Sequence, residues 1–370
     1  MARTMRLTLP AVDESGEVEG AIRSGLSWVD ELASRNDIRW FCLPLNFVAD
    51  GPRHERLTSA LDAVSRFPRM FLNMILAEEG RIAIEAVDDA ADLVLKVARK
   101  SNNGFDNFRV GASFNCPPNT PFFPFSRHEG SSIAFSFALE TTSLALEITR
   151  NRGSDIAALR DQLTEALAGV LRRIHAVGVE LETQIGVEYR GLDASLAPFP
   201  DGDMSVALLI EQILGSPPGS SGAVFVTSLL TDALRSAIIE SGAKAVGFNG
   251  VMFSLLEDNH LARANNRRAL TMDSLVALAA VCGCGVDMVP IPGASFREEV
   301  AALMLDIAGL SSTLKKPLGV RVLPIPNRST NEFTQFNLDF LCDSRVMSLH
   351  SGDHSFGTQK RLLEYRAPIR

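Results

Sequence analysis

The chain has 370 residues, of which 46% are hydrophobic, and its formal net charge is −8. This acidic balance excludes the basic surface that nucleic-acid backbones attract, so nucleic acid is not an expected partner. Five cysteines, an odd number in a chain of this size, argue against a disulfide framework and favour a reducing cytoplasm. No apolar run is long enough to span a membrane, and the start lacks the apolar core of a signal peptide.

In the first half of the chain, apolar stretches of strand length alternate with amphipathic stretches of helix length. The predicted strands are 37–48, 71–77, 108–114 and 132–140, and the predicted helices are 53–67, 86–100 and 155–177.

The second half repeats this alternation. The predicted strands are 181–189, 286–290 and 318–324, and the predicted helices are 205–214, 222–240, 272–282 and 296–315. The stretch 245–256 is apolar, with a turn predicted at Asn249-Gly250. Such alternation is typical of βαβ units and a largely parallel sheet. No break in composition separates two domains, so we expect one α/β domain over residues 1–370. The strand number favours a barrel of about ten strands with helices outside.

Three Pro-x-Pro segments, at 198–200, 290–292 and 324–326, follow predicted strands. Two prolines hold the chain extended and remove two N–H donors, so the loop leaves its strand in one direction. The first segment leads to Ser205 at a predicted helix start, where unpaired N–H groups can hold an anion. Because ligands bind at the carboxyl ends of parallel strands, these loops predict a site. The alternative is that Pro, Gly and Ser serve only as turn and cap residues.

Arg321 lies inside the apolar run 318–324, where a charge must be paired or must face a cavity. It is either an ion-pair partner of Asp287 or Asp306, or a clamp for a carboxylate or phosphate. Glu257 and Asp258 follow another apolar run and are either a source of a general base or only a helix start.

These patterns define the candidate site. The candidate acid/base residues are Glu257, Asp287 and Glu140. The candidate substrate-binding residues are Arg109, Ser195, Ser205, Asn249, Lys316 and Arg321. We expect Arg109, Ser195, Asp287 and Arg321 to line one cavity.

His350 and His354 suggest an alternative metal site, since residues four apart share a helix face. Gly352 argues against a helix there, and no third ligand has diagnostic spacing. Cys282 and Cys284 match no zinc or redox signature. Cys116 lies in a loop with no activating neighbour. The sequence has no nucleophile elbow, phosphate loop or dinucleotide fingerprint, so it requires no particular cofactor.

Five short motifs in order resemble the uncharacterised family DUF711 over about residues 35–325. They are RVGAS with PFFP at 109–113 and 121–124, SLAP with SVA at 195–198 and 205–207, GFNG with LED at 247–250 and 256–258, GVDM with IPG at 285–288 and 291–293, and KP with VRVLP at 316–317 and 320–324. The resemblance implies a barrel similar to pyruvate formate-lyase and other glycyl-radical enzymes. It does not imply their chemistry, because the sequence RVMSL at 345–349 lacks the radical glycine of those enzymes.

Together these observations predict an enzyme with hydrolase-type or lyase-type acid/base chemistry on a small anionic or amide-containing metabolite. Polar groups that converge at a barrel mouth are typical of such a site. Two alternatives remain: a metal-dependent hydrolase that uses the C-terminal histidine pair, and a non-catalytic ligand-binding barrel. A homo-oligomer is compatible with all three hypotheses.

Overall fold

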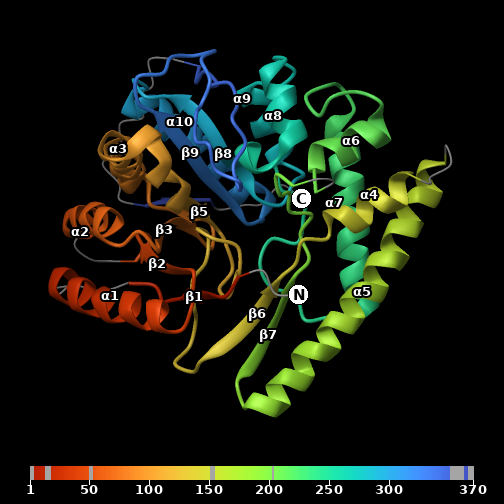
Figure 1. Cartoon of the computed structure of the whole chain (residues 1–370), viewed down its shortest axis with the longest axis horizontal. Coiled ribbons are helices and arrows are strands. Elements are labelled where there is room, and N and C mark those ends of the chain that lie inside the picture. Colours follow the sequence, from red (N-terminus) through yellow and green to blue (C-terminus); the bar gives the residue numbers. More distant parts are fainter. Residues whose placement is uncertain are drawn as a thin grey trace.

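The computed structural model describes residues 4–12, 18–49, 53–150, 155–201, 204–350 and 362–365, without the side chains of 18–24 and 53–56. The main sheet has the strand order β1-β2-β3-β5-β9-β8 (Figure 1). These strands are β1 Arg6–Thr8, β2 Trp40–Asn46, β3 Met70–Glu78, β5 Val110–Phe114, β8 Gly285–Pro292 and β9 Leu318–Ile325. Two short strands, β4 Arg81–Ile82 and β10 Leu363–Glu364, extend it from β3, and β6 Ala134–Ala138 pairs with β7 Glu188–Asp193.

The sheet consists of two parallel groups that run in opposite directions. Strands β1, β2, β3 and β5 are parallel to their neighbours, and so are β8 and β9, whereas β5 and β9 pair antiparallel. The predicted α/β class and mostly parallel sheet are therefore confirmed. A consequence is that the amino ends of the first group lie at the same edge as the carboxyl ends of β8 and β9.

Single β-bridges connect the main sheet to the β6–β7 pair. The bridges pair residue 192 with 245, 196 with 251, 254 with Asp287 of β8, and Pro10 after β1 with His128 before β6. All these bridges are parallel. They are isolated contacts, and among the described residues no continuous ladder closes the sheet into a barrel.

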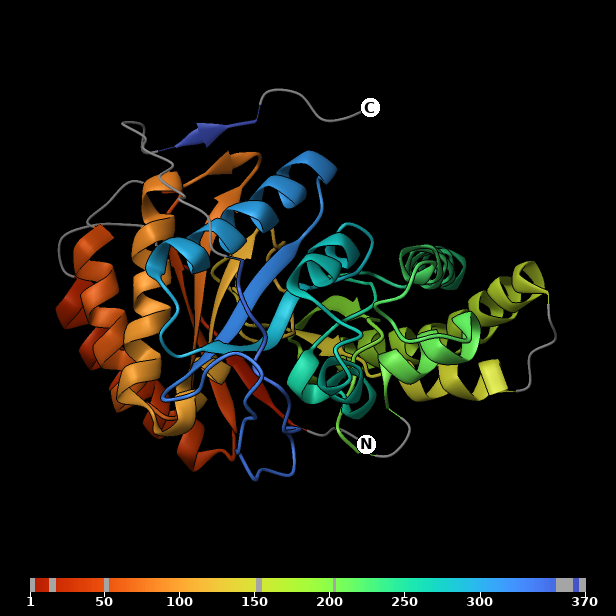
Figure 2. The ribbon, with the colours of Figure 1, turned by 90° about the horizontal axis from the view of Figure 1, so that it is seen from above.

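Two groups of helices flank the strands (Figure 2). One group packs on the main sheet and consists of α1 Val18–Arg35, α2 Arg53–Arg66, α3 Ile84–Lys100, α10 Arg297–Leu314 and the 3-10 helix η1 Asn102–Arg109. The other group lies on the side of β6 and β7 and consists of α4 Thr142–Arg150, α5 Ile156–Ile185, α6 Val206–Leu214, α7 Ala223–Ser241 and α8 Asn259–Asn266. The short helices η2 Leu255–Glu257 and α9 Met272–Ala279 contact β8. No helix in the described part of the chain is both long and apolar enough to cross a membrane.

Hydrophobic periodicity explains the elements that were predicted well. Helix α3 buries Ala86, Val87, Ala90, Ala91 and Val94 at spacings of three and four residues. The prediction at 181–189 was wrong, because α5 continues to Ile185 and β7 begins only at Glu188. Alternating apolar residues near 177–181 fit a strand as well as a helix, and the helix ends at Gly186 in a left-handed conformation.

The segment 117–128 lies against one face of the sheet at the junction of β5 and β9. A side chain at Gly111 or Gly319 would come within 2.7 Å or 2.4 Å of the Phe125 ring, so glycine is required at both positions for this close approach. Asn73 Nδ2 of β3 donates to the Ser126 carbonyl at 3.2 Å. This segment is therefore held against the sheet, and Phe122, Phe123 and Phe125 within it line the candidate site.

Candidate functional site

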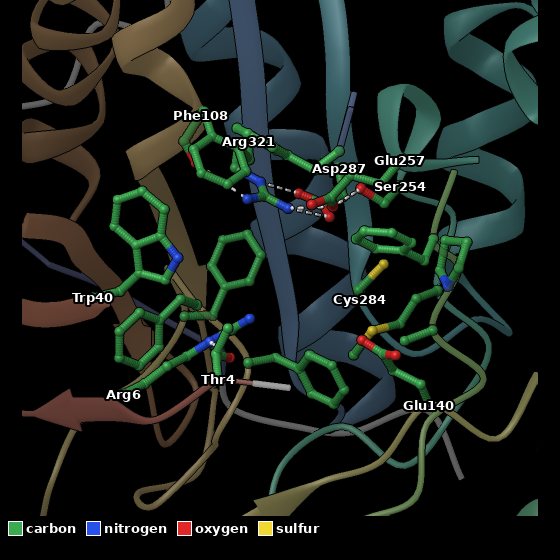
Figure 3. Close-up of a pocket in the computed structure, with 18 of the residues that line it drawn as sticks. Thr4, Arg6, Trp40, Phe108, Glu140, Ser254, Glu257, Cys284, Asp287 and Arg321 are labelled. Atoms are coloured by element: carbon green, nitrogen blue, oxygen red, sulfur yellow. Dashed lines mark hydrogen bonds and ion pairs between the residues drawn. The ribbon is translucent and has the colours of Figure 1, made fainter. Parts of the chain in front are cut away.

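A cavity of about 120 Å³ lies where the amino ends of β1 and β2 face β8, β9 and the segments after β6 and β7 (Figure 3). Six charged side chains line it: Arg6, Arg39, Glu140, Glu257, Asp287 and Arg321. Seven aromatic side chains line it as well: Trp40, Phe108, Phe122, Phe123, Phe125, Phe199 and Phe340. A small cavity that combines apolar walls with a few charged groups has the composition of a ligand site.

Arg321 is the centre of the buried charge network. Its Nε donates to Asp287 Oδ1 at 2.6 Å and its Nη2 to Asp287 Oδ2 at 2.8 Å, since β8 and β9 place the two residues directly opposite. Nη2 also donates to Glu257 Oε2 at 3.0 Å, and Nη1 to the Phe108 carbonyl at 3.1 Å. Burial alone would lower the pKa of Arg321, but the two carboxylates raise it overall. The predicted ion pair of Arg321 with Asp287 is therefore confirmed, and Arg321 also lines the cavity, whereas its role as a clamp for a carboxylate or phosphate stays a prediction.

Glu257 in η2 differs from Asp287 in how its oxygens are used. The Ser254 hydroxyl and Arg321 both donate to Oε2 of Glu257, and within the described residues Oε1 accepts no hydrogen bond. Burial raises the pKa of Glu257, Asp287 raises it further, and Arg321 opposes both effects. Glu257 is 25% exposed and Asp287 7% exposed. The carboxyl group most suited to exchange a proton with a ligand is therefore that of Glu257.

Arg6 and Arg39 were not predicted as site residues. Arg6, the first residue of β1, lies across the cavity from Glu257 in Figure 3, with its Nε 3.3 Å from Thr4 Oγ1. The guanidinium of Arg39 lies 5.1 Å from the ring centre of Trp40. One sequence signal was available: Thr4, Arg6 and Thr8 alternate with apolar residues, as expected for one face of a short strand.

Glu140, which follows β6, lies on the wall opposite Arg6 and below Cys284 in Figure 3, separate from the Arg321 network. Cys284 is a second residue that was not predicted to line the cavity. Burial opposes ionisation of its neighbour Cys282, but a hydrogen bond with Cys284 and the Lys316 ammonium lower the pKa of Cys282 to about 6. The hydrogen bond with Cys282 raises the pKa of Cys284.

Arg109 does not line this cavity, which corrects the prediction that it shares a cavity with Arg321. Its guanidinium donates to the carbonyls of Val64, Phe67 and Met70 at 3.0, 3.0 and 2.8 Å, and to Asp106 at 2.6 Å. Because α2 ends directly beside the start of β5, the side chain of Arg109 turns toward the end of that helix. Arg109 therefore joins α2, β3 and η1 to one another.

Ser195 is also outside the cavity, a second correction, and so is Asn249. Both belong to a buried turn around Asp193. Ser195 Oγ donates to Asp193 Oδ1 at 2.6 Å, and the Asn249 backbone N–H donates to the same oxygen at 3.2 Å. Gly247 approaches this carboxylate so closely that a Cβ would lie 2.1 Å from its Oδ2. Burial raises the pKa of Asp193, and these hydrogen bonds oppose the rise.

Ser205 and Lys316 hold helix ends and do not line the cavity either. Ser205 is the N-cap of α6, accepts from the Leu208 N–H at 2.9 Å and donates to Asp258 Oδ1 at 2.6 Å. Lys316 Nζ donates to the carbonyl of Ala279, the last residue of α9, at 2.8 Å and to that of Cys282 at 2.6 Å. The alternative interpretation of Ser205, as a cap residue, is thus the one its contacts support.

The metal alternative depends on residues that the structure covers only in part. His350 is exposed, with its Nε2 3.2 Å from Asp273 Oδ2, and it is not among the cavity residues. His354 lies outside the described residues. Among the described residues, no three His, Cys, Asp or Glu side chains are grouped so that they could hold a metal ion.

Comparison with known proteins places this chain in a family. Residues 8–339 match the family model described as "Uncharacterised ACR (DUF711)". A UPF0210 protein of Pyrobaculum aerophilum is 32% identical over 287 residues, 75% of this chain and 61% of the relative. UPF0210 proteins of Pyrobaculum arsenaticum and Methanopyrus kandleri are 30% and 28% identical, over 86% and 73% of this chain and 71% and 61% of the relatives. The match thus spans about three fifths to seven tenths of the length of these relatives. The chain belongs to the DUF711 family of uncharacterised proteins.

Proposed function

We propose that the protein is an enzyme that performs acid/base chemistry on a small anionic metabolite, with Glu257 as the group that transfers the proton. The observation that carries this proposal is the position of Glu257 in the cavity wall, held through Oε2 by Ser254 and Arg321. Oε1 has no partner within the described residues, so this oxygen can reach a ligand.

The neighbours of Glu257 support a division of roles. Arg321 occupies both oxygens of Asp287, so Asp287 positions Arg321 and does not itself exchange a proton with the ligand. Burial raises the pKa of Glu257, so its carboxyl group keeps a proton to higher pH than an ordinary glutamate and is suited to donate or accept one. Glu140 on another wall supplies a second carboxylate to the same cavity.

The arginines support an anionic substrate. Arg6 and Arg39 face the cavity, and neither forms an ion pair with a carboxylate of the described residues. The amide-containing substrate that the sequence also allows would leave these two charges without a partner.

The finer fold prediction remains part of the proposal. We propose that the four single bridges mark the places where the strands close into a barrel of about ten strands, similar in form to that of pyruvate formate-lyase. The cavity would then lie inside the barrel mouth. A cytoplasmic location fits, because all five cysteines are free.

The experiment is a screen for turnover of small carboxylates, esters and amides, followed by Glu257→Gln in any reaction found. We expect Glu257→Gln to lower kcat at least about 100-fold, the usual contribution of a general acid or base. We also expect it to remove the limb of the pH–rate profile that belongs to this carboxyl group. Glu298→Gln, at an exposed carboxylate on α10, is the matched control. Full activity of Glu257→Gln contradicts the assignment, and no turnover across the panel favours a non-catalytic ligand-binding protein.

A further inference from the structure

The charges of the cavity lie on different walls. Arg321, Asp287 and Glu257 form a closed network on one wall, and Arg6 and Arg39 lie on another. Counted at full charge, the network carries −1, because one guanidinium serves two carboxylates, the two other arginines carry +2, and Glu140 on a further wall carries −1. An anion entering the cavity is therefore repelled from the network and attracted to Arg6 and Arg39.

Arg6 and Arg39 are held by contacts that leave their charge available. The guanidinium of Arg6 lies 5.4 Å from the ring centre of Phe123, and that of Arg39 lies 5.6 Å from the ring centre of Phe340. Stacking on a ring orients a guanidinium but leaves its in-plane N–H groups able to bind a planar anion. A carboxylate matches this geometry because two parallel N–H groups can bind its two oxygens.

The remaining walls set the size and shape of the ligand. A closed apolar cavity of about 150 Å³ in another protein binds benzene, so about 120 Å³ with an open side accommodates one small ring. Arg6 and Arg39 each lie over one face of some of these rings, and the remaining aromatic surface of the cavity is apolar, so such a ring can pack against it. A ligand without an apolar body, such as inorganic phosphate, would leave this surface in contact with water.

We propose that the substrate is a small planar monocarboxylate, aromatic or conjugated, with its carboxylate bound by Arg6 and Arg39 and its ring among the aromatic side chains. The opposite edge of the ring then faces Oε1 of Glu257, across the cavity from Arg6 (Figure 3). This inference rests on the proposed function, since it names the substrate class of the same site.

Trp40 provides a direct measurement of binding. The chain has two tryptophans, and Trp28 on α1 is exposed, so Trp28→Phe leaves Trp40 as the only fluorophore of its kind. The probes are benzoate, benzamide, acetate and inorganic phosphate, titrated against this variant at neutral pH, with calorimetry as the second readout. Benzamide has the shape of benzoate without its charge, and acetate has the charge without the ring.

We expect benzoate to change the Trp40 emission and to bind at least tenfold more tightly than benzamide, acetate or phosphate. Arg6→Gln and Arg39→Gln should each weaken benzoate at least tenfold and leave benzamide unchanged. Arg35→Gln, an exposed arginine on α1, is the matched control and should change nothing. Glu257→Gln should still bind benzoate, because the carboxylate is held elsewhere.

Two results overturn the inference before any arginine is changed: benzamide or phosphate binding as tightly as benzoate, and acetate binding as tightly as benzoate. A third is benzoate affinity unchanged in both arginine variants. The test also separates this inference from the proposed function. Selective benzoate binding with no turnover of any planar carboxylate retains the ligand class and rejects the enzyme. Turnover of a neutral amide that depends on Glu257, with no benzoate binding, retains the enzyme and rejects the ligand class.

Discussion

Arg109 and Arg321 are two buried arginines beside neighbouring strands, and they have different partners. Arg109 is 3% exposed and Arg321 4% exposed, and each donates four hydrogen bonds to described residues. Arg109 binds mainly backbone carbonyls, which have no charge and do not titrate. Arg321 binds two carboxylates beside a cavity, and one of them has a raised pKa. A buried charge therefore occurs both at a structural contact between elements and at the wall of a cavity, and its partners distinguish the two cases.

The strongest test of this difference compares Arg321→Met with Arg109→Met. Arg321→Met leaves Asp287 and Glu257 without their cation, and we expect it to lower the free energy of unfolding by about 3–5 kcal/mol near pH 8. Removing the cation raises the pKa of Glu257 further, so protonation relieves the loss as the pH falls toward 5. Arg109→Met should lose about 1–3 kcal/mol, because it leaves carbonyls without donors, and this loss should not change with pH.

Urea denaturation at several pH values measures both losses. Parallel pH dependence in the two variants would show that the two arginines are equivalent.

The next effect concerns the segment 117–128, whose phenylalanines line the cavity. Gly319→Ala would place a methyl group 2.4 Å from the Phe125 ring, and we expect it to lower the free energy of unfolding by about 1–3 kcal/mol. Since Phe125 lines the cavity, the same change should weaken benzoate binding. Gly169→Ala in α5 is the control: nothing lies within 4 Å of its Cβ, and removing a helical glycine should stabilise by about 0.5–1 kcal/mol. Thermal unfolding of both variants measures these two effects. An unchanged stability of Gly319→Ala would mean that the segment 117–128 can shift to accommodate the methyl group.

A smaller effect is expected from Glu257→Gln. Because folding raises the pKa of Glu257, the wild type loses stability as the pH rises from the ordinary carboxyl range, about 4.3, through the raised pKa. The neutral amide lacks this loss, so the stability of Glu257→Gln relative to wild type should increase with pH over that window. Each unit of raised pKa corresponds to about 1.4 kcal/mol. A relative stability that falls with rising pH would show that the pKa is lowered.

The smallest effect is expected at Asp106, the one carboxylate that Arg109 binds. Its side chain is 30% exposed, so solvent screens the pair, and Asp106→Asn should lower the free energy of unfolding by about 0.2–1 kcal/mol. Asp287→Asn, at the buried pair, should lose several times more. Equal losses in urea denaturation would remove the distinction between the two regions.

The candidate site could be predicted from sequence only in part. Glu140, Glu257, Asp287 and Arg321 were predicted and do line one cavity, because a charge next to a buried strand requires either a partner or an opening. Arg109 has the same sequence signal, yet the end of α2 supplies its partners. Arg6 was missed, because the three-residue strand β1 is too short for its alternation to stand out. Arg39, which directly precedes β2, was missed as well.

The sequence by itself determined the α/β class, the mostly parallel sheet and the main helices, because hydrophobic periodicity is local and sets which face of each element is buried. It also determined the family, through short motifs in order. Only the tertiary structure decided which buried charge faces a carbonyl, which faces a carboxylate and which faces the cavity. Those partners come from segments far apart in the chain, such as Glu257 and Arg321. A local sequence pattern cannot predict that two such residues lie within hydrogen-bond distance.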